Sequence, residues 1–405
     1  MKILFLTQIV PYPPDAGPKV KTWNVLRFLA SQGHSITLAT FVRSSELPHL
    51  VAIRSLGIEV FSIPIQRSRL ADIGYLLRSL LTRKSFLVER DNLSPMRHLV
   101  SQLIAERHFD VVHADQFTMP QFVPLHYSNS DHPTRIFDAH NANWSVIERI
   151  QANAPFFQKP FLALEQRRLK KYEGQIVSAF EHTLAVTDID RRLLIEAAAS
   201  VNSAQDAADR IITVPIAVDT RELQPIKRQP GSLRILTLGS LHYQPNADGI
   251  RWFIQEIFPR IRSELPQAAL TIIGKKPPAD FVQLAQQDDL VTVTGYIPDL
   301  TPYLEQGAVM VIPVRAGGGM RVRILEAFAR GIPVVTTTTG LEGIDARPGQ
   351  DVLVADTPAD FASLVTRLLK DPILQEGLSV SGRRLVEEKY DWQAVLGRLN
   401  PIYCK

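Results

Sequence analysis

The order of apolar and polar residues predicts alternating strands and helices along the whole chain. Short apolar runs predict buried strands, and stretches with apolar residues three and four positions apart predict helices. In the first half the predicted strands cover residues 2–7, 35–41, 60–63, 110–113, 135–138 and 182–186, the last strand of that half. In the second half they cover residues 234–238, 270–273, 291–294, 308–314 and 334–337. This alternation is typical of α/β domains with mostly parallel sheets.

Several predicted helices carry end signals. Gly33 ends a helix over residues 19–32, and Pro160 suits the first turn of a helix that runs through Tyr172. Thr357 is expected to cap a later helix. The remaining helices are predicted at residues 247–262, 320–330, 358–370, 372–388 and 391–403.

The length and one polar segment predict how the chain is divided. A chain of 405 residues is too long for one ordinary core, so two domains are expected. Residues 211–232 become polar and rich in proline, which predicts a linker between residues 1–210 and residues 233–388. We therefore predict an α/β fold of two tandem doubly wound, Rossmann-like domains. Ligands bind such sheets at the carboxyl ends of strands, so a ligand is expected in a cleft between the domains.

A glycine-rich turn between two predicted buried strands carries the strongest indication of chemistry. It lies where the strand at residues 308–314 ends and the next helix begins, and its glycines are Gly317, Gly318 and Gly319. Glycine lets backbone N–H groups approach a ligand closely, and a helix N-terminus favours an anion. The alternative for the glycines alone is tight packing of the turn.

Charged residues after the glycines strengthen the interpretation as a phosphate site. Arg321 and Arg323 oppose the helix dipole unless an anion lies in front of them, the alternative being a solvated helix face. Glu326 follows one turn later, within reach of a hydroxyl group beside that anion. A phosphate with a sugar attached fits this arrangement.

Composition restricts the class of protein. Hydrophobic residues make up 45% and charged residues 21% of the chain, as in soluble globular proteins, and the net charge is +4. No apolar run reaches membrane-spanning length, and the first residues are expected to form a core strand rather than a signal peptide. The only cysteine, Cys404, excludes intrachain disulfides and cysteine metal clusters and fits a cytoplasmic location.

Four motifs in this order resemble glycosyltransferase family 4, the retaining, nucleotide-sugar-dependent enzymes of the GT-B fold. Residues 11–17 resemble the loop that approaches the donor phosphates and the acceptor, and residues 237–246 resemble the first βα loop of the second domain. Residues 295–299 resemble the loop that holds the base, and residues 317–335 resemble the nucleotide-sugar signature. The resemblance implies donor contacts by Gly17, Gly239, Ser240, Tyr296, Ile297, Gly317, Gly318, Gly319, Met320, Arg321, Arg323 and Glu326.

The resemblance also implies roles for the parts of the chain. The domain at residues 1–210 would be the acceptor side, and the domain at residues 233–388 would bind a UDP- or GDP-sugar, with no further cofactor. The last helix, within residues 389–405, would cross back and pack on the first domain.

In its second half the chain departs from the family pattern at two places. The family signature has two glutamates, of which Glu326 corresponds to the second, implied to hold the ribose, whereas the first falls on Gly318. Backbone N–H groups of residues 318–320 are expected to take its place. The arginine and lysine common near Ser240 are also absent, so the two arginines after the glycines are the nearest replacements. We associate these departures with a branch of bacterial cell-surface polysaccharide transferases.

Two polar residues after strands of the first half are candidates for catalysis. Asp115 stands two positions beyond His113, where many family members have a second histidine. His140 follows the next strand. For both, the alternative is a side chain that only hydrogen-bonds a strand end.

Other patterns do not point to a metal site or a hydrolase. Asp188 and Asp190 match a metal motif of the other large transferase fold, but helix capping is the favoured interpretation. We find no other convincing metal-ligand spacing, no nucleophile elbow and no Walker loop. We predict no metal and no nucleic-acid partner.

Two basic amphipathic stretches lie in the first half. Residues 67–84 mix leucine and isoleucine with five cations, and residues 166–171 add four more. The favoured interpretation is a solvated helix face packed on the core. The alternative is peripheral contact with anionic lipid at the inner face of the membrane, which would suit a lipid-linked acceptor.

These observations predict a hexosyltransferase-like, retaining and metal-independent glycosyltransferase. It would move a sugar from a nucleoside diphosphate to a glycan or lipid-linked acceptor in cell-surface polysaccharide synthesis. Two alternatives stay open: a non-catalytic nucleotide-sugar-binding subunit, and an epimerase or phosphorylase of the same fold. A phosphorylase would need a pyridoxal-phosphate lysine, for which Lys275 and Lys276 are the only lysines at a plausible strand end.

Overall fold

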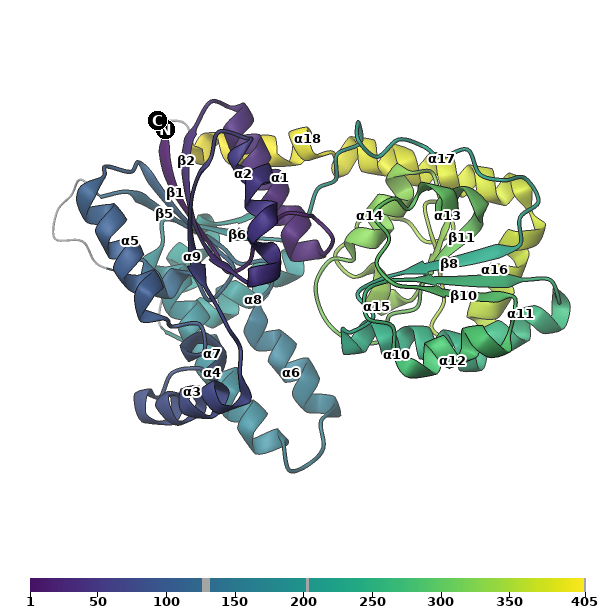
Figure 1. The fold of residues 1–405 in the computed structure, drawn as a ribbon, viewed down its shortest axis with the longest axis horizontal. Coiled ribbons are helices and arrows are strands. Elements are labelled where there is room, and N and C mark those ends of the chain that lie inside the picture. The colour runs from purple at the N-terminus through teal and green to yellow at the C-terminus, as the bar shows by residue number, and fades with distance from the viewer. Residues whose placement is uncertain (126–131, 202–203, 404–405) are drawn as a thin grey trace. The chain divides into compact units, whose positions relative to one another are not determined.

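The chain folds into two compact units. The computed structural model describes residues 1–125, 132–201 and 204–403, so Cys404 lies outside the described residues. The first unit comprises Met1–Ile216 and the segment from Leu396 onward, and the second comprises Ala217–Val395. Each unit is built on a parallel sheet with helices on both faces (Figure 1). The predicted fold class, two doubly wound Rossmann-like domains, is confirmed.

The first unit has a sheet of order β3-β2-β1-β4-β5-β6-β7. Its strands are β1 (Lys2–Thr7), β2 (Ser35–Val42), β3 (Glu59–Pro64), β4 (Val111–Asp115), β5 (Thr134–Asp138), β6 (His182–Ala185) and β7 (Ile211–Thr213). Its helices are α1 (Gly17–Ser31), η1 (Ser44–His49), α2 (Leu50–Arg54), α3 (Arg69–Thr82), α4 (Phe86–Glu89), α5 (Ser94–Glu106), η2 (Pro120–Phe122), α6 (Asn143–Asn153), α7 (Lys159–Ala179), α8 (Asp188–Ala199), α9 (Ala204–Arg210), η4 (Gly397–Leu399) and α19 (Asn400–Tyr403). The chain reverses direction across the sheet between β3 and β4, so the ends of β1 and β4 flank a topological switch point.

The second unit has a sheet of order β10-β9-β8-β11-β12-β13. Its strands are β8 (Arg234–Leu238), β9 (Ala269–Ile273), β10 (Val291–Thr294), β11 (Gly307–Ile312), β12 (Val334–Thr336) and β13 (Leu353–Val354). Its helices are α10 (Gln244–Trp252), η3 (Phe253–Ile257), α11 (Phe258–Glu264), α12 (Ala279–Gln287), α13 (Thr301–Gln306), α14 (Val322–Ala329), α15 (Thr338–Leu341), α16 (Pro358–Lys370) and α17 (Pro372–Lys389), followed by α18 (Trp392–Leu396). Here β8 and β11 flank the switch point.

The central strands are mostly apolar because helices cover both faces of each sheet. Every residue of β11 is buried, and β1 is buried after its first residue. Helix ends follow the predicted signals: the Thr357 hydroxyl accepts a hydrogen bond from the Asp360 N–H at the start of α16. Gly33, with φ of 79°, follows the end of α1. These local signals place the strand ends, and with them the loops that carry polar residues.

Several details differ from the sequence prediction, among them the unpredicted two-residue edge strand β13 of the second sheet. The first sheet has one more strand than predicted, because β7 lies within the region expected to be linker and pairs with β6 at the edge. The helix predicted at residues 247–262 is interrupted by the π-helical turn η3, and Pro259 lies in the first turn of the next helix, α11, instead of continuing the first. The helix predicted at residues 391–403 is broken into α18, η4 and α19. Helix α14 begins after Arg321 rather than before it.

Candidate functional site

Two carboxylates lie side by side at the switch point of the first sheet. Asp115 and Asp138 end the neighbouring parallel strands β4 and β5 and are partners in register. Both are completely buried. Two adjacent buried carboxylates repel each other and lose their hydration, so each requires donors or cations within the protein.

Asp115 is satisfied by three side chains. Its Oδ2 atom accepts hydrogen bonds from the hydroxyls of Thr7 and Thr22, each at 2.9 Å. Its Oδ1 atom lies 2.7 Å from Nε2 of His140. Thr22 comes from α1, the helix that begins at Gly17. The two residues predicted to be catalytic candidates, Asp115 and His140, are therefore in direct contact.

His140 is held in an unusual backbone conformation. Its φ is 42°, a region that non-glycine residues rarely adopt and that costs free energy. The loop that follows is fixed by two buried acids: Asp190 accepts from the Ala142 N–H, and Glu173 accepts from the Asn143 N–H. When Nε2 of a neutral imidazole donates to a carboxylate, Nδ1 is an acceptor. The Asp115–His140 pair thus has the arrangement of an oriented base.

Asp138 is paired with a buried ammonium group. Lys21 of α1 is 2% exposed and its Nζ contacts the Asp138 carboxylate. Burial acts to raise the pKa of Asp138, but Lys21 and the neighbouring His113 and His140 outweigh it, and the pKa lies below its ordinary value. His113 Nε2 lies 3.7 Å from Asp138 Oδ2. Asp138 is therefore ionised inside the unit.

The far end of the chain completes this cluster. Tyr403 of α19 is buried, and its hydroxyl contacts Nδ1 of His113. The two rings stack with centroids 6.3 Å apart, and Phe5 stacks on His113 at 4.2 Å. Burial, with Asp138 and Asp115 nearby, raises the pKa of the Tyr403 hydroxyl. Tyr403 therefore remains protonated, and its hydroxyl shares a hydrogen bond with the imidazole in the direction that the His113 tautomer sets.

Three members of the cluster have side chains that bind metal ions in other proteins. Ligand atoms of His113, Asp115 and Asp138 lie within 4.8 Å of one another. In this unit Lys21 supplies the positive charge on Asp138, and hydroxyls and His140 satisfy Asp115. The chemistry the cluster supports directly is hydrogen bonding and proton exchange at His140.

The glycine turn lies at the switch point of the second sheet. Gly317 and Gly319 have φ of 101° and 85°, a conformation that side chains disfavour. A Cβ atom built on Gly317 would lie 3.5 Å from the Tyr243 hydroxyl and 3.7 Å from Pro245. The turn after β11 therefore faces the loop between β8 and α10, as expected where two loops meet at a switch point.

The arginines predicted to face a phosphate make contacts within this turn. Arg321 precedes α14, and its Nη1 donates to the carbonyl of Gly318 at 2.6 Å. Arg323 Nη1 donates to Glu326 Oε2 at 2.5 Å, so the predicted phosphate and ribose residues are paired with each other. Met320 is buried and anchors the turn. The turn is thus a compact group of backbone N–H groups, guanidinium groups and one carboxylate.

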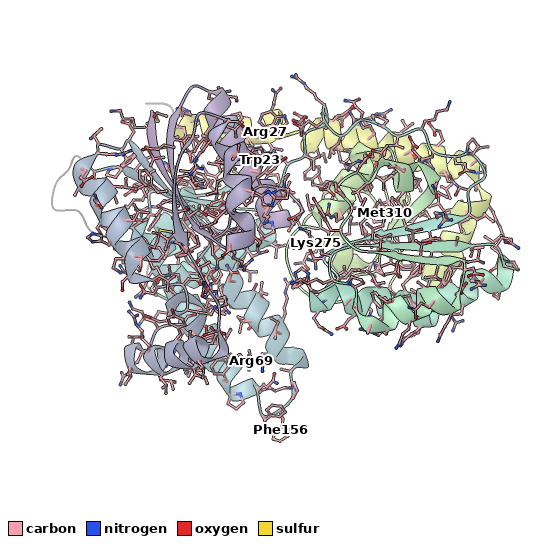
Figure 2. The ribbon with its side chains drawn as sticks, viewed as in Figure 1. Trp23, Arg27, Arg69, Phe156, Lys275 and Met310 are labelled. Atoms are coloured by element: carbon pink, nitrogen blue, oxygen red, sulfur yellow. The ribbon has the colours of Figure 1, made fainter. Side chains whose placement is uncertain are left out.

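The other predicted donor residues lie at the ends of neighbouring strands. Gly239 and Ser240 follow β8, and the Asn246 amide donates to the Ser240 carbonyl at 3.3 Å. Tyr296 and Ile297 follow β10, and the Lys275 ammonium lies 4.3 Å from the Tyr296 ring centroid. Figure 2 labels Lys275 in the second unit, just beyond the end of β9.

Sequence reasoning missed several residues of these two sites. Lys21 and Thr22 belong to an amphipathic helix, where such residues usually face solvent. Asp138 and His113 were visible as polar residues at strand ends, a signal that could have placed them beside Asp115. Tyr403 lies 290 residues from His113, and no local signal could join them.

Comparisons with known proteins agree with this architecture. Residues 232–371 match the family model described as glycosyl transferases group 1. The chain is 19% identical to an uncharacterised 44.6 kDa protein in the cps region of Klebsiella pneumoniae, over 98% of both chains. It is 28% identical over 155 residues to a GDP-mannose-dependent monoacylated alpha-(1-6)-phosphatidylinositol monomannoside mannosyltransferase of Corynebacterium glutamicum, which is 36% of this chain and 41% of that one.

The fold of the whole chain is that of GT-B glycosyltransferases. The crystal structure of Anabaena HepE in complex with UDP-glucose superposes with a TM-score of 0.69 at 13% identity, over 100% of this chain and 99% of that one. Together with the family match, this supports a glycosyltransferase. Among the described residues, no helix has the length and apolar character needed to cross a membrane.

Proposed function

We propose that this protein is a retaining, hexosyltransferase-like enzyme that transfers a sugar from a UDP- or GDP-sugar to a glycan or lipid-linked acceptor without a metal ion. We assign it to bacterial cell-surface polysaccharide synthesis in the cytoplasm. The observation that carries the proposal is the glycine turn at the switch point of the second sheet, with two arginines and a glutamate around it. The group 1 match, over residues 232–371, lies within this unit and includes the turn.

The second unit is the donor-binding part in this proposal. Backbone N–H groups of the turn and the Arg321 guanidinium would neutralise the diphosphate, and preorganised donors of this kind lower a barrier by several kcal/mol in other enzymes. Glu326 would accept hydrogen bonds from ribose hydroxyls. Binding would then require Arg323 to share Glu326 with the ribose, since the two side chains are paired in the structure.

The first unit contributes the Asp115–His140 pair in this proposal. An imidazole oriented by a carboxylate binds a sugar hydroxyl through Nδ1 and can exchange a proton with it. The ion pair of Lys21 and Asp138 would keep the charges beside that imidazole in fixed positions. Because the hydrogen bond that His140 donates to Asp115 fixes the ring, removal of Asp115 should cost as much activity as removal of His140.

The proposal is tested first by donor binding. Calorimetry should detect binding of UDP, GDP or their sugars, and Glu326→Ala should weaken it by about 1–3 kcal/mol, the loss of a charge-assisted hydrogen bond. Glu388→Ala, at an exposed position of α17, is the matched control and should leave affinity unchanged. Equal affinity for Glu326→Ala and the wild type would remove Glu326 from the site.

Transfer assays then separate the proposed enzyme from its alternatives. A purified protein that binds a nucleotide sugar but neither hydrolyses nor transfers it would be a binding subunit. Release of an epimerised nucleotide sugar would indicate an epimerase. Activity that survives a chelator is expected, and strict dependence on added Mg²⁺ or Mn²⁺ would contradict the metal-free mechanism.

A further inference from the structure

One helix of the first unit turns its apolar side outward. On α3 the residues Leu70, Ile73, Leu77, Leu80 and Leu81 are each between 49% and 85% exposed. Their spacing of i, i+3, i+7, i+10 and i+11 puts them on one face of the helix. A helix on a water-soluble surface normally buries such a face, so α3 shows the reverse of the usual orientation.

Polar contacts attach the opposite side of α3 to the protein. Ser79 is buried, and Arg168 of α7 donates to its hydroxyl at 3.1 Å. Arg78 Nε lies 3.0 Å from Glu89 Oε2, on the neighbouring helix α4. The outward orientation of the leucines is therefore fixed by specific hydrogen bonds and an ion pair. This structure contradicts the interpretation of residues 67–84 as a solvated face packed on the core through its apolar residues.

A second apolar group continues this surface. Phe161 and Leu164 of α7 are exposed and lie on the same face of that helix as Arg168, at i, i+3 and i+7. Because Arg168 contacts α3, this face of α7 adjoins α3. It leads to the turn between α6 and α7, where Phe156 is 85% exposed and Phe157 follows it. Figure 2 shows Phe156 at the tip of this hairpin and Arg69 on α3, both away from the sheet.

The charges around this surface are of one sign. Arg69, Arg83, Lys84 and Lys159 are exposed beside the apolar residues. Within residues 69–84 and 155–164 the one acidic residue, Asp72, is partly buried, so no acidic side chain is exposed there. Apolar side chains ringed by lysine and arginine are the composition of segments that lie in the interface of an anionic bilayer. A symmetric pairing of two copies would instead bring like charges together.

We propose that the exposed face of α3, with the α6–α7 turn, is the surface by which this protein docks on an anionic membrane. The leucines and phenylalanines enter the boundary between headgroups and acyl chains, and the cations contact lipid phosphates. The inference deepens the proposed function, on which its biological purpose rests, by naming the surface that would bring the enzyme to a lipid-linked acceptor. The docking itself requires no sugar transfer.

The test is co-sedimentation of the purified full-length protein with vesicles. Vesicles that contain phosphatidylglycerol should bind the protein, phosphatidylcholine vesicles should bind it weakly, and added salt should release it. The variant with Leu77→Gln, Leu80→Gln and Leu81→Gln should bind at least about tenfold more weakly. These side chains are exposed, so the fold should be retained, as circular dichroism would verify. The matched control carries Ile373→Gln and Val380→Gln, at exposed apolar positions of α17.

The charge contribution is tested separately. Arg69→Gln with Lys84→Gln should reduce the difference between anionic and neutral vesicles, whereas Arg260→Gln with Arg384→Gln, exposed in the second unit, should preserve it. The proposal would be overturned if the wild-type protein did not co-sediment with anionic vesicles, or if the leucine variant bound them as strongly as the wild type. A wild-type dimer in sedimentation velocity that becomes a monomer in the leucine variant would also overturn the proposal. Vesicle binding without any transfer would refute the proposed function and leave the docking surface standing.

Discussion

The buried pair of Lys21 and Asp138 allows a quantitative test of how the first unit is built. Replacing Lys21 by methionine keeps the length of the side chain and removes the ammonium group, while Asp138 stays completely buried. Breaking a buried ion pair by removing one partner costs about 3–5 kcal/mol, because the remaining charge has no compensation. Asp115, the register neighbour of Asp138, adds a second carboxylate to that environment. We therefore expect Lys21→Met to lie at the upper end of this range.

The assay is urea unfolding followed by circular dichroism, with the transition of the first unit compared among four proteins. These are the wild type, Lys21→Met, Asp138→Asn and the double variant. The double variant should be more stable than Lys21→Met, because the uncompensated carboxylate is gone. The loss in Lys21→Met should also shrink as the pH is lowered toward 5, since burial raises the pKa of Asp138 and Lys21, the largest charge that opposes it, is gone, while His113 and His140 remain. A loss below about 1 kcal/mol that does not change with pH would refute the argument.

Three further predictions test other parts of the two units. Burial raises the pKa of Glu173 from 4.5 to about 7, so the folded protein holds this proton more tightly than the unfolded chain does. The melting temperature of the wild type should therefore fall as the pH rises from 4.5 through 7, whereas that of Glu173→Gln should not show this fall. Tyr403→Phe keeps the packing of α19 but removes the hydroxyl that hydrogen-bonds His113, so a transfer assay should show an altered pH profile with near-normal thermal stability. Gly249→Ala would bring a Cβ to 2.2 Å from the Pro313 carbonyl, so it should lower the thermal stability of the second unit and weaken nucleotide binding in calorimetry, whereas Gly377→Ala, with open space around it, should do neither.

The spacing of apolar residues and the residues at helix ends were sufficient to predict the order of strands and helices. The central strands of both sheets are mostly apolar and are bounded by turns, and β8 and β10 have the predicted limits. The short edge strands β7 and β13 have three and two residues, too few to show a pattern. The break of the predicted helix at η3 follows from Pro259, whose effect depends on how the neighbouring turns pack.

The candidate sites were predictable only in part. Glycines, arginines and a glutamate close together in sequence marked the turn before α14, because their chemistry is local. The contacts that define the first unit's cluster are long-range: Thr22 and Asp115 are 93 residues apart, and Lys21 and Asp138 are 117 apart. The exposure of the apolar face of α3 could not be predicted from the sequence either. An apolar stripe shows that a helix has two different faces, but it does not show which face the rest of the protein covers.

The polar cluster in the first unit requires an explanation other than stability. Apolar side chains of similar volume are often as stabilising as a buried ion pair or more so, so Lys21 and Asp138 do not by themselves favour the fold. What the pair does is fix a negative charge beside Asp115 and His140, within 4.0 Å of the imidazole Nε2. Asp115 and Asp138 therefore both lie beside Nε2 of the imidazole, which holds the ring in one orientation. In the proposed reaction His140 binds a sugar hydroxyl, and the buried charges serve to hold its imidazole in place for that contact. This function explains why the chain keeps a polar cluster that is costly to bury. Tyr403 extends the cluster to the last described turn of the chain.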